Sequence, residues 1–280
     1  MPENNERIYL DHAATTPVRE EVLAAMVPFW RDGYNPSSLH AEGRRARAAL
    51  DDARERIARA LGAAPKEIVF TAGGSEADNL AVLGAARALA DRGRHAVTSA
   101  FEHHAVLHAL DVLEQEGWTV TRLGVDANGL VDPAAFEAAL GPQTVLASIM
   151  LANNEIGTIE PIARLAAIAR ANGVVFHTDA VQACGSIPLD AAELGVDLLS
   201  IAAHKFYGPK GVGALFVRQG TPLQSLLVGG TQEYGRRAGT ENLAGVVGMA
   251  TALDLALAEM PQSAPVSYTH LRAHETGRNL

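Results

Sequence analysis

Short apolar runs alternate with helical patterns along most of this chain, and that alternation limits the possible folds more than any other feature. Apolar spacing of the helical kind, ended by glycine in several cases, predicts helices over residues 44–61, 78–92, 105–116, 133–140, 161–172 and 241–258. Runs typical of strands fall at residues 68–71, 96–99, 118–123, 145–151, 174–177, 198–203 and 213–217. Strands alternating with helices predict an α/β fold with a mainly parallel, doubly wound sheet.

Composition excludes several classes of protein. The 280 residues are 48% hydrophobic, which is enough for one large core. A net charge of -9 without basic runs argues against nucleic-acid binding. No eighteen-residue window is both apolar and free of charge, and residues 1–6 are not typical of a signal peptide. The only cysteine is Cys184, so no internal disulfide can form. We therefore expect a cytoplasmic protein with no membrane association.

In a doubly wound sheet, ligands bind outside the carboxyl ends of the strands, so the residues that follow each strand are the first candidates for chemistry. Gly73, Gly74 and Ser75 follow the strand at 68–71 and open a helix. Free N–H groups at a helix start favour an anion, and glycine lets a ligand approach the backbone. This stretch matches neither the GxxxxGK[ST] nor the GxGxxG motif. A phosphate cradle and a plain glycine-rich helix cap both remain open here.

Histidines and an aspartate follow two further strands. His104 and His108 lie one helical turn apart, but no third ligand is close in sequence, so we predict no metal site. His103 suits an imidazole that lies over a flat cofactor and transfers protons. Asp179 ends a buried strand, where a carboxylate needs a partner. A protonated ring nitrogen would be such a partner, and a role as the N-cap of the next helix is the alternative.

Lys205 directly follows the apolar run at 198–203 and precedes a Gly-Pro turn. It is either a surface lysine in that turn or an amine whose pKa is lowered by burial, which is how lysines become nucleophiles toward carbonyl cofactors. A phosphate cradle, a stacking imidazole, an aspartate and a lysine together are what pyridoxal phosphate requires. The combination, in order along one sheet, favours the cofactor interpretation.

Seven strings of sequence carry a resemblance to a known family. They are IYLDHAATTP at 8–17, TAGGSE at 71–76, EH at 102–103, NNEIG at 153–157, HTDAVQ at 177–182, HK at 204–205 and RAGT at 237–240. With them the chain resembles the cysteine desulfurases of the NifS/IscS type, within the class V aminotransferase superfamily, from about residue 8 to 259. The resemblance implies a fold type I pyridoxal-phosphate large domain, and conversion of L-cysteine to L-alanine with sulfur passed to an enzyme cysteine, for iron–sulfur cluster assembly or thiolation.

The resemblance also implies roles for individual residues. Lys205 would bond to the cofactor's aldehyde, and His103 would stack on the ring and transfer protons. The other implied cofactor contacts are Asp179 on the ring nitrogen, Gln182 on the ring oxygen, Asn154 on cofactor and substrate, and Gly74, Ser75 and His204 on the phosphate. Thr240 would reach the phosphate of a neighbouring subunit, which implies a homodimer, although it could instead cap the helix that follows. A sulfur-acceptor protein is the further partner implied.

Two departures from the family pattern stand out. Ala202 replaces the usual serine three residues before the lysine, which removes one phosphate hydrogen bond. The family's nucleophilic cysteine and carboxylate-binding arginine lie beyond the matching region, and Cys184 is not at a position that the family uses for chemistry. We therefore expect an N-terminal segment at 1–16, a cofactor-binding large domain at 17–260, a foreign or disordered tail at 261–280, and a missing small C-terminal domain. Another class V enzyme, such as an aminotransferase or selenocysteine lyase, and an inactive cofactor-binding fragment are the alternatives.

Overall fold

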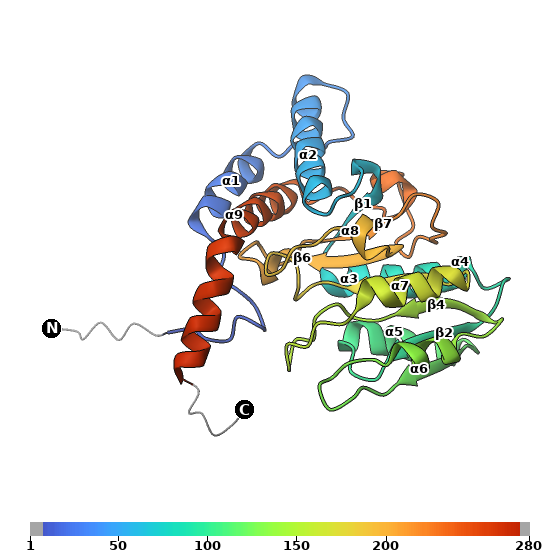
Figure 1. The fold of residues 1–280 in the computed structure, drawn as a ribbon. Coiled ribbons are helices and arrows are strands. Elements are labelled where there is room, and N and C mark those ends of the chain that lie inside the picture. Colours follow the sequence, from blue (N-terminus) through green and yellow to red (C-terminus); the bar gives the residue numbers. More distant parts are fainter. Residues whose placement is uncertain (1–7, 275–280) are drawn as a thin grey trace.

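The computed structural model describes residues 8–274, and the side-chain surroundings of residues 8–262. Within them the chain forms one seven-stranded sheet in the order β1-β7-β6-β5-β4-β2-β3 (Figure 1). Its strands are β1 (Ile68–Thr71), β2 (His95–Ser99), β3 (Thr119–Leu123), β4 (Thr144–Ser148), β5 (Val175–Asp179), β6 (Leu198–Ala202) and β7 (Gly213–Val217). All neighbouring pairs are parallel except those of β7, which runs antiparallel to both β1 and β6. The predicted mainly parallel, doubly wound α/β sheet is confirmed.

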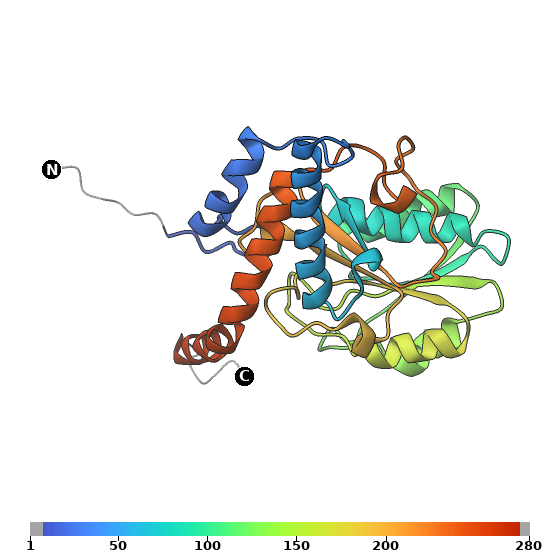
Figure 2. The same ribbon diagram turned by 90° about the horizontal axis from the view of Figure 1, so that it is seen from above.

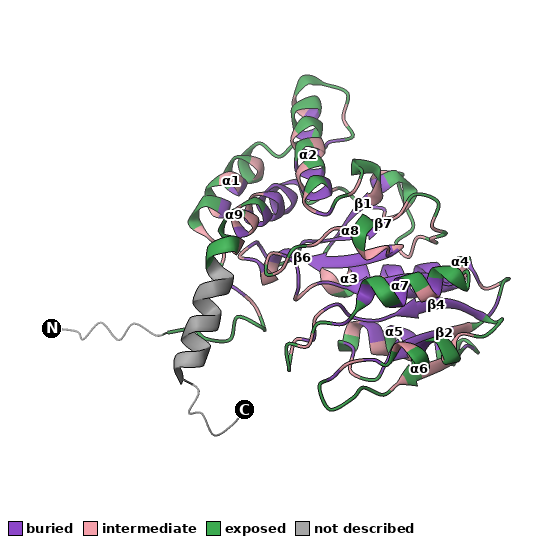
Figure 3. Ribbon diagram, in the orientation of Figure 1, coloured by how far each residue is buried: buried purple, intermediate pink, exposed green. Residues whose placement is uncertain are grey.

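Helices cover both faces of the sheet. Its central strands β4, β5 and β6 are therefore buried along their whole length. One face packs against α3 (Gly74–Asn79), the π-helical turn η2 (Leu80–Gly84), α4 (Ala85–Ala88) and α5 (His104–Gln115). The other packs against α2 (Ala41–Ala60), α6 (Pro133–Ala139), α7 (Ile162–Ala171), α8 (Ala191–Leu194) and α9 (Leu243–His274). Figure 3 shows buried strands between helices that expose their outer sides. Short 3₁₀ turns complete the elements: η1 (Pro65–Glu67), η3 (Ala203–Lys205) and η4 (Gln232–Gly235).

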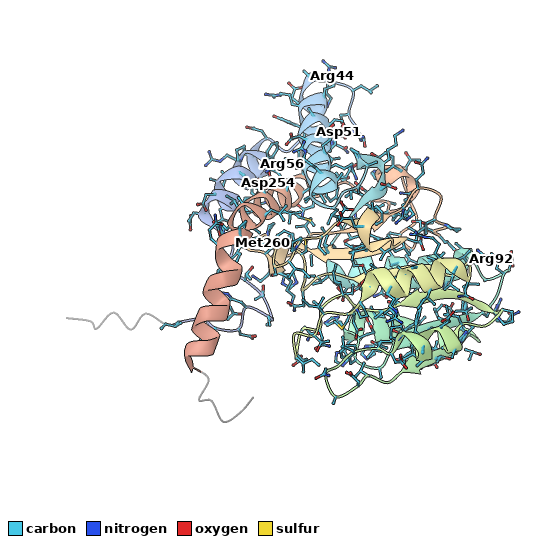
Figure 4. The ribbon with its side chains drawn as sticks, viewed as in Figure 1. Arg44, Asp51, Arg56, Arg92, Asp254 and Met260 are labelled. Carbon is cyan, nitrogen blue, oxygen red and sulfur yellow. The ribbon has the colours of Figure 1, made fainter. Side chains whose placement is uncertain are left out.

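The N-terminal helices and the last helix form one group beside the sheet. The helix α1 (Glu20–Arg31) and α2 both pack against α9, which passes between them in Figure 2. Figure 4 shows Arg56 of α2 near Asp254 of α9, and the Arg56 Nε–H donates to the Asp254 carboxylate at 2.8 Å. Val22 and Met26 of α1 are buried in the same core.

The helix α9 extends further than the pattern at 241–258 predicts. It continues to His274 and changes direction near Met260, immediately before Pro261 (Figures 1 and 4). Its first part, Leu243–Gln262, is long and apolar enough to cross a membrane, but 56% of that window is buried inside the protein, as in a core helix. The side chains of 263–280 lie outside the described residues, so the expectation of a foreign or disordered tail stays a prediction.

Other elements differ from the sequence prediction in their bounds or were not predicted. The strand expected at 145–151, for example, is Thr144–Ser148. The helix expected at 78–92 begins at Gly74, continues through the π-helical turn and ends at Ala88. The strand expected at 174–177 extends to Asp179, which places that carboxylate inside β5. The helix α1 is not predicted, because Pro28 lies inside it and Val22 and Met26 are its only buried residues. The predicted parts at 1–16 and 17–260 are not separately tested, and residues 1–7 lie outside the described part.

Candidate functional site

A cavity of about 870 Å³ opens at the carboxyl ends of β1, β4, β5 and β6, where the sheet topology places ligands. Eight of the nine predicted site residues line it: Gly74, Ser75, His103, Asn154, Asp179, Gln182, His204 and Lys205. They come from five separate segments of the chain, so their meeting is a property of the fold. The ninth, Thr240, is exposed and lies outside the cavity lining.

Lys205 ends the 3₁₀ turn η3 that follows β6. Its amine Nζ donates to the backbone carbonyl oxygens of Ala13 and Ala14, the latter at 3.0 Å. Burial lowers the pKa of this amine below its ordinary value, while the nearby carboxylates of Asp179 and Asp11 oppose the shift. A lysine with a lowered pKa at a cavity wall has the properties of a nucleophilic amine, so it is not a plain surface lysine in a turn.

Asp179 is the last residue of β5 and is 5% exposed. Its Oδ1 accepts the Val181 N–H at 2.8 Å within a turn. No α-helix begins in that turn, since α8 starts only at Ala191, so Asp179 is not the N-cap of the next helix. Burial raises the pKa of Asp179 to about 6, against the opposing effects of that N–H and of Lys205. The carboxyl group is thus held at the cavity by the sheet.

The turn after β1 brings backbone close to the cavity. Gly73 has φ of +153°, and Gly74 starts α3 with little space around it: a Cβ there would lie 2.9 Å from Val181 Cγ2 and 3.4 Å from Ala202 Cβ. Ala202 is fully buried at the same wall, next to the turn. The Ala202 methyl group therefore faces the glycine-rich turn and offers it no hydrogen-bond donor.

Histidines occupy two further sides of the cavity. His103 caps α5, its Nδ1 accepting the Ala105 N–H at 3.2 Å, and burial lowers its pKa, as do the neighbouring His104 and Lys205. The His204 Nδ1 lies 3.1 Å from the Thr15 hydroxyl, and burial lowers its pKa too. Both rings are therefore biased toward the neutral form that accepts protons.

Amide side chains complete the rim of the cavity. The Gln182 amide donates to the Ala13 carbonyl at 2.9 Å, and the Asn154 amide donates to Glu155 at 2.9 Å. Residues of 11–15 thus hold both Lys205 and Gln182 from the N-terminal side. No local pattern in this stretch shows that it lies against residues 169–192 positions away.

The sequence raises two further roles, a metal site at His104 and His108 and a helix cap at Thr240, and the structure bears on both. His104 and His108 have ring centroids 5.2 Å apart, yet they belong to no group of potential metal ligands among the described residues. The group that does gather is Asp78, His103 and Asp179, whose ligand atoms lie within 4.8 Å of one another. Thr240 does not cap α9, since Asn242 precedes that helix and its Oδ1 accepts the Gly245 N–H at 3.1 Å.

Cys184 is 1% exposed, and burial raises the pKa of its thiol to about 12. A thiol in this state is not ionised near neutral pH and does not reach the cavity lining. This placement supports the expectation that Cys184 does not replace the family's nucleophile, which stays a prediction.

Comparisons with known proteins agree with the site. The sequence profile described as aminotransferase class-V matches residues 8–276. The cysteine desulfurase IscS of Dictyoglomus turgidum is 56% identical over 254 residues, which are 90% of this chain and 64% of the relative. The IscS of Methanosarcina thermophila is 47% identical over 98% of this chain and 72% of its own. The chain therefore spans about two thirds of the length of these relatives, and less in the first case.

Two solved structures share the fold. A NifS-like protein superposes with a TM-score of 0.90 at 40% identity, over 92% of this chain and 72% of its own. A structure described as SspA in complex with cysteine has a TM-score of 0.86 at 42% identity, over 89% of this chain and 72% of its own. With the lysine, aspartate and histidine of the predicted motifs in one cavity, and with this profile and these relatives, the chain belongs to the class V aminotransferase family.

Proposed function

We propose that this chain is the cofactor-binding part of a pyridoxal-phosphate-dependent cysteine desulfurase. The observation that carries the proposal is the convergence of Lys205 and Asp179, from the ends of the adjacent strands β6 and β5, on one cavity. The relatives named cysteine desulfurase IscS point to the same activity. Because the chain spans only part of their length, the substrate and the reaction are inferences from this shared part.

The residues present fit pyridoxal phosphate. Asp179 offers a buried carboxylate to a ring nitrogen, the turn at Gly73–Ser75 offers N–H groups at a helix start, and Lys205 offers an amine of lowered pKa. Gln182, Asn154 and His204 supply further polar groups on the same walls. When bound, the cofactor would supply an electron sink for a carbanion at the substrate's Cα.

The chain's own residues can be given roles in the desulfurase reaction. Lys205 would hold the cofactor's aldehyde carbon, and its amine of lowered pKa would be placed to move a proton at the substrate's Cα. His103, biased toward its neutral form, accepts the proton of the incoming amine or thiol. L-cysteine is the proposed substrate, and the related SspA structure is described as a complex with cysteine.

Sulfur transfer needs a thiolate that attacks the substrate sulfur, forming an S–S bond while the C–S bond breaks and its electron pair stays with the carbon product. Cys184 is the chain's one cysteine, and it is buried with a raised pKa. This chain can therefore bind and deprotonate the substrate without completing sulfur transfer. The sulfur-acceptor protein would act on the full-length enzyme.

The cofactor assignment is tested by mixing the purified chain with pyridoxal phosphate and recording the visible absorption band of the lysine-bound cofactor. We expect the band in the wild type and its complete loss in Lys205→Ala. Lys210→Ala is the matched control, because Lys210 lines the same cavity and should keep the band. A band that survives Lys205→Ala would show that the cofactor is bonded elsewhere and contradict the proposal.

The substrate assignment is tested on the cofactor-loaded chain with L-cysteine, and with D-cysteine and L-serine as controls. L-cysteine should change the absorption spectrum while sulfide release stays at the level of free cofactor. Sulfide release well above that level would show that this chain is complete without a further cysteine. An equal spectral response to all three amino acids would favour another class V reaction.

The homodimer and the cytoplasmic location stay predictions. Thr240 is exposed and outside the cavity of its own chain, as a residue that serves a second copy would be. Sedimentation velocity of the wild type should give the mass of two chains. Mixing Thr240→Ala with Lys205→Ala should then restore part of the phosphate affinity in hybrid dimers, and the absence of any complementation would contradict shared sites.

A further inference from the structure

Asp78 is a buried carboxyl group that the cofactor assignment does not use. It lies in α3 and is 1% exposed, yet it belongs to the lining of the cavity. Its carboxyl oxygen lies within 4.8 Å of the ligand atoms of Asp179 and His103. Its Oδ1 has no hydrogen-bond partner among the described residues. An unpartnered buried oxygen next to a second carboxylate needs a physical explanation.

The described surroundings of Asp78 contain no counter-charge. The nearest basic side chain, His177 of β5, is 3.6 Å away through its Nε2 and fully buried. Its Nδ1 lies 2.8 Å from the Ser148 hydroxyl and its Nε2 lies 3.0 Å from the Ser200 hydroxyl, so two hydroxyls satisfy the ring without a charge. Burial lowers the pKa of His177 to about 3, which keeps the ring neutral at physiological pH.

The charged groups that act on Asp78 from other elements are negative. Asp179 of β5 and Glu102, after β2, both act on Asp78 as like charges, and the Ser200 hydroxyl alone favours its ionised form. The helix α5, which packs against α3, carries His104, His108, Asp111 and Glu114, and none of them is among the groups that shift the pKa of Asp78. The strands β1 and β7, which also contact α3, carry no titratable side chain.

The other titratable groups that line the cavity are Asp11, Glu76, Glu155, His103, His204, Lys205 and Lys210. Of these, His103 has a ring nitrogen within 4.8 Å of the carboxyl oxygens of Asp78 and Asp179, and Lys205 favours the ionised form of Asp179.

Two adjacent buried carboxyl groups with one cation nearby do not both ionise, because the second charge would be repelled and poorly solvated. The proton belongs on the member with fewer stabilising donors. Asp179 accepts the Val181 N–H and is favoured in its ionised form by the charge of Lys205, whereas Asp78 has only the Ser200 hydroxyl. Burial and the charge of Asp179 correspondingly raise the pKa of Asp78 well above its ordinary value.

We propose that Asp78 is a positioning residue that acts through Asp179: as a neutral acid beside that carboxylate, it keeps the aspartate pair at a single negative charge. One charge on the pair matches one protonated ring nitrogen, so the buried site is neutral when the cofactor is bound. The inference rests on the proposed function for its ligand, but the charge state of the pair is a property of the chain itself.

The charge state can be measured without the cofactor, by infrared spectroscopy of the protonated carboxyl stretch. At neutral pH we expect two such bands, from Asp78 and from Glu102, whose pKa burial raises to about 8. Asp78→Asn should remove one band and Glu102→Gln the other. In Asp179→Asn the Asp78 band should disappear at a pH lower by about one unit or more, because the like charge is gone.

The functional part is measured as the dissociation constant of pyridoxal phosphate. Asp78→Asn keeps the shape and the neutral state, so its dissociation constant should stay within about threefold of the wild type. Asp78→Ala removes the support beside Asp179 and should weaken binding by about tenfold or more. Asp78→Asn is also the variant that keeps the test valid if Asp78→Ala does not fold.

Distinct outcomes would overturn the proposal. A wild type without the Asp78 band, or an Asp78 titration that Asp179→Asn leaves unchanged, would show that the two carboxyls do not share one proton. Stabilisation of the chain by Zn²⁺ alone, abolished in Asp78→Asn, would show two ionised carboxylates around a cation. Failure of the proposed function, in contrast, would appear as no absorption band in any variant, with the infrared bands unaffected.

Discussion

Arg54 and Glu233 form a buried ion pair beside β1, whereas Asp78, Glu102 and Asp179 bring three buried carboxyl groups together near the cavity. The first pair is joined by two hydrogen bonds of 2.7 and 2.8 Å, and Arg54 also donates to the Ile68 carbonyl at 2.7 Å. Glu233 further accepts the Phe70 N–H at 2.9 Å. Within the described part of the chain, only the Arg54 Nε of this cluster lacks a partner.

The carboxyl cluster is built in the opposite way. Its members repel one another, and both Asp78 Oδ1 and Glu102 Oε2 lack hydrogen-bond partners among the described residues. A buried ion pair with its hydrogen bonds made is costly to break, while buried carboxyl groups without partners cost stability and persist where a ligand uses them. The contrast therefore separates a structural anchor from a binding site without reference to any relative.

The anchor also explains a strained turn. Glu233 and Tyr234 have φ of +48° and +58°, a region that residues other than glycine rarely adopt. The ion pair, with the Arg54 guanidinium 4.6 Å from the Phe70 ring centre and 5.3 Å from that of Tyr234, offsets a cost of about 1–3 kcal/mol for such a conformation. The turn leads directly to Thr240, so the anchor also places that residue.

The largest effect should come from breaking the anchor. Glu233→Gln leaves Arg54 buried without its counter-charge, and we expect the free energy of unfolding to fall by about 3–5 kcal/mol in urea denaturation. The control is Asp51→Asn, which breaks the exposed Arg47–Asp51 pair and should cost less than about 0.5 kcal/mol. Equal effects of the two variants would show that the buried Arg54–Glu233 pair is no more important for stability than an exposed ion pair.

The second effect concerns pH and Glu102. Burial raises its pKa from 4.5 to about 8, so the folded state binds the extra proton and stability falls as pH rises between these values. Glu102→Gln should flatten this dependence and raise the free energy of unfolding above pH 8 by about 2–4 kcal/mol relative to the wild type. The exposed Glu137→Gln is the control, and a wild type whose stability rises through this range would contradict the assignment.

A third change adds a missing donor to the cavity. Ala202→Ser places a hydroxyl beside the Gly74 turn and should tighten pyridoxal phosphate by about 1.5–3 kcal/mol, the usual contribution of a hydrogen bond to a charged group. Equilibrium titration of the absorption band measures this. Ala203→Ser, the neighbouring buried alanine outside the cavity lining, is the control and should not tighten binding. An unchanged affinity in Ala202→Ser would place the phosphate elsewhere.

The smallest effect on stability should come from Asp179→Asn. We expect this variant to be more stable without the cofactor but to bind the cofactor more weakly. The introduced amide oxygen would still accept the Val181 N–H, while the buried charge is lost, so the cofactor-free chain should gain about 1–2 kcal/mol near neutral pH. Affinity for the cofactor should fall. Thermal unfolding with and without pyridoxal phosphate measures the stability and the cofactor affinity of the variant. A cofactor-free variant less stable than the wild type would show that Asp179 stabilises the fold, as the Arg54–Glu233 pair does.

Sequence alone predicts much of this fold and site, for reasons that can be given residue by residue. Lys205, Asp179 and Gly74 follow apolar strands, and the ends of parallel strands meet at one edge, so order along the chain becomes proximity in space. Glu233 gives no local signal, because its partners Arg54 and Phe70 lie 163–179 positions away. Asp78 reads as an ordinary polar residue in the first turn of a helix. Its proposed role depends on the distance to Asp179, which cannot be predicted from the spacing of apolar residues.

The packing of α9 between α1 and α2 has a consequence for synthesis of the chain on the ribosome. The helices α1 and α2 are both complete at Ala60, whereas α9, against which they pack, begins only at Leu243. At a synthesis rate of about 5–20 residues per second, the apolar sides of α1 and α2 remain without α9 for roughly 10–45 s. During that time Val22, Met26 and Leu50 lack the helix that later helps to cover them. Nascent chains that stop short of α9 should therefore be the forms that holding chaperones retain.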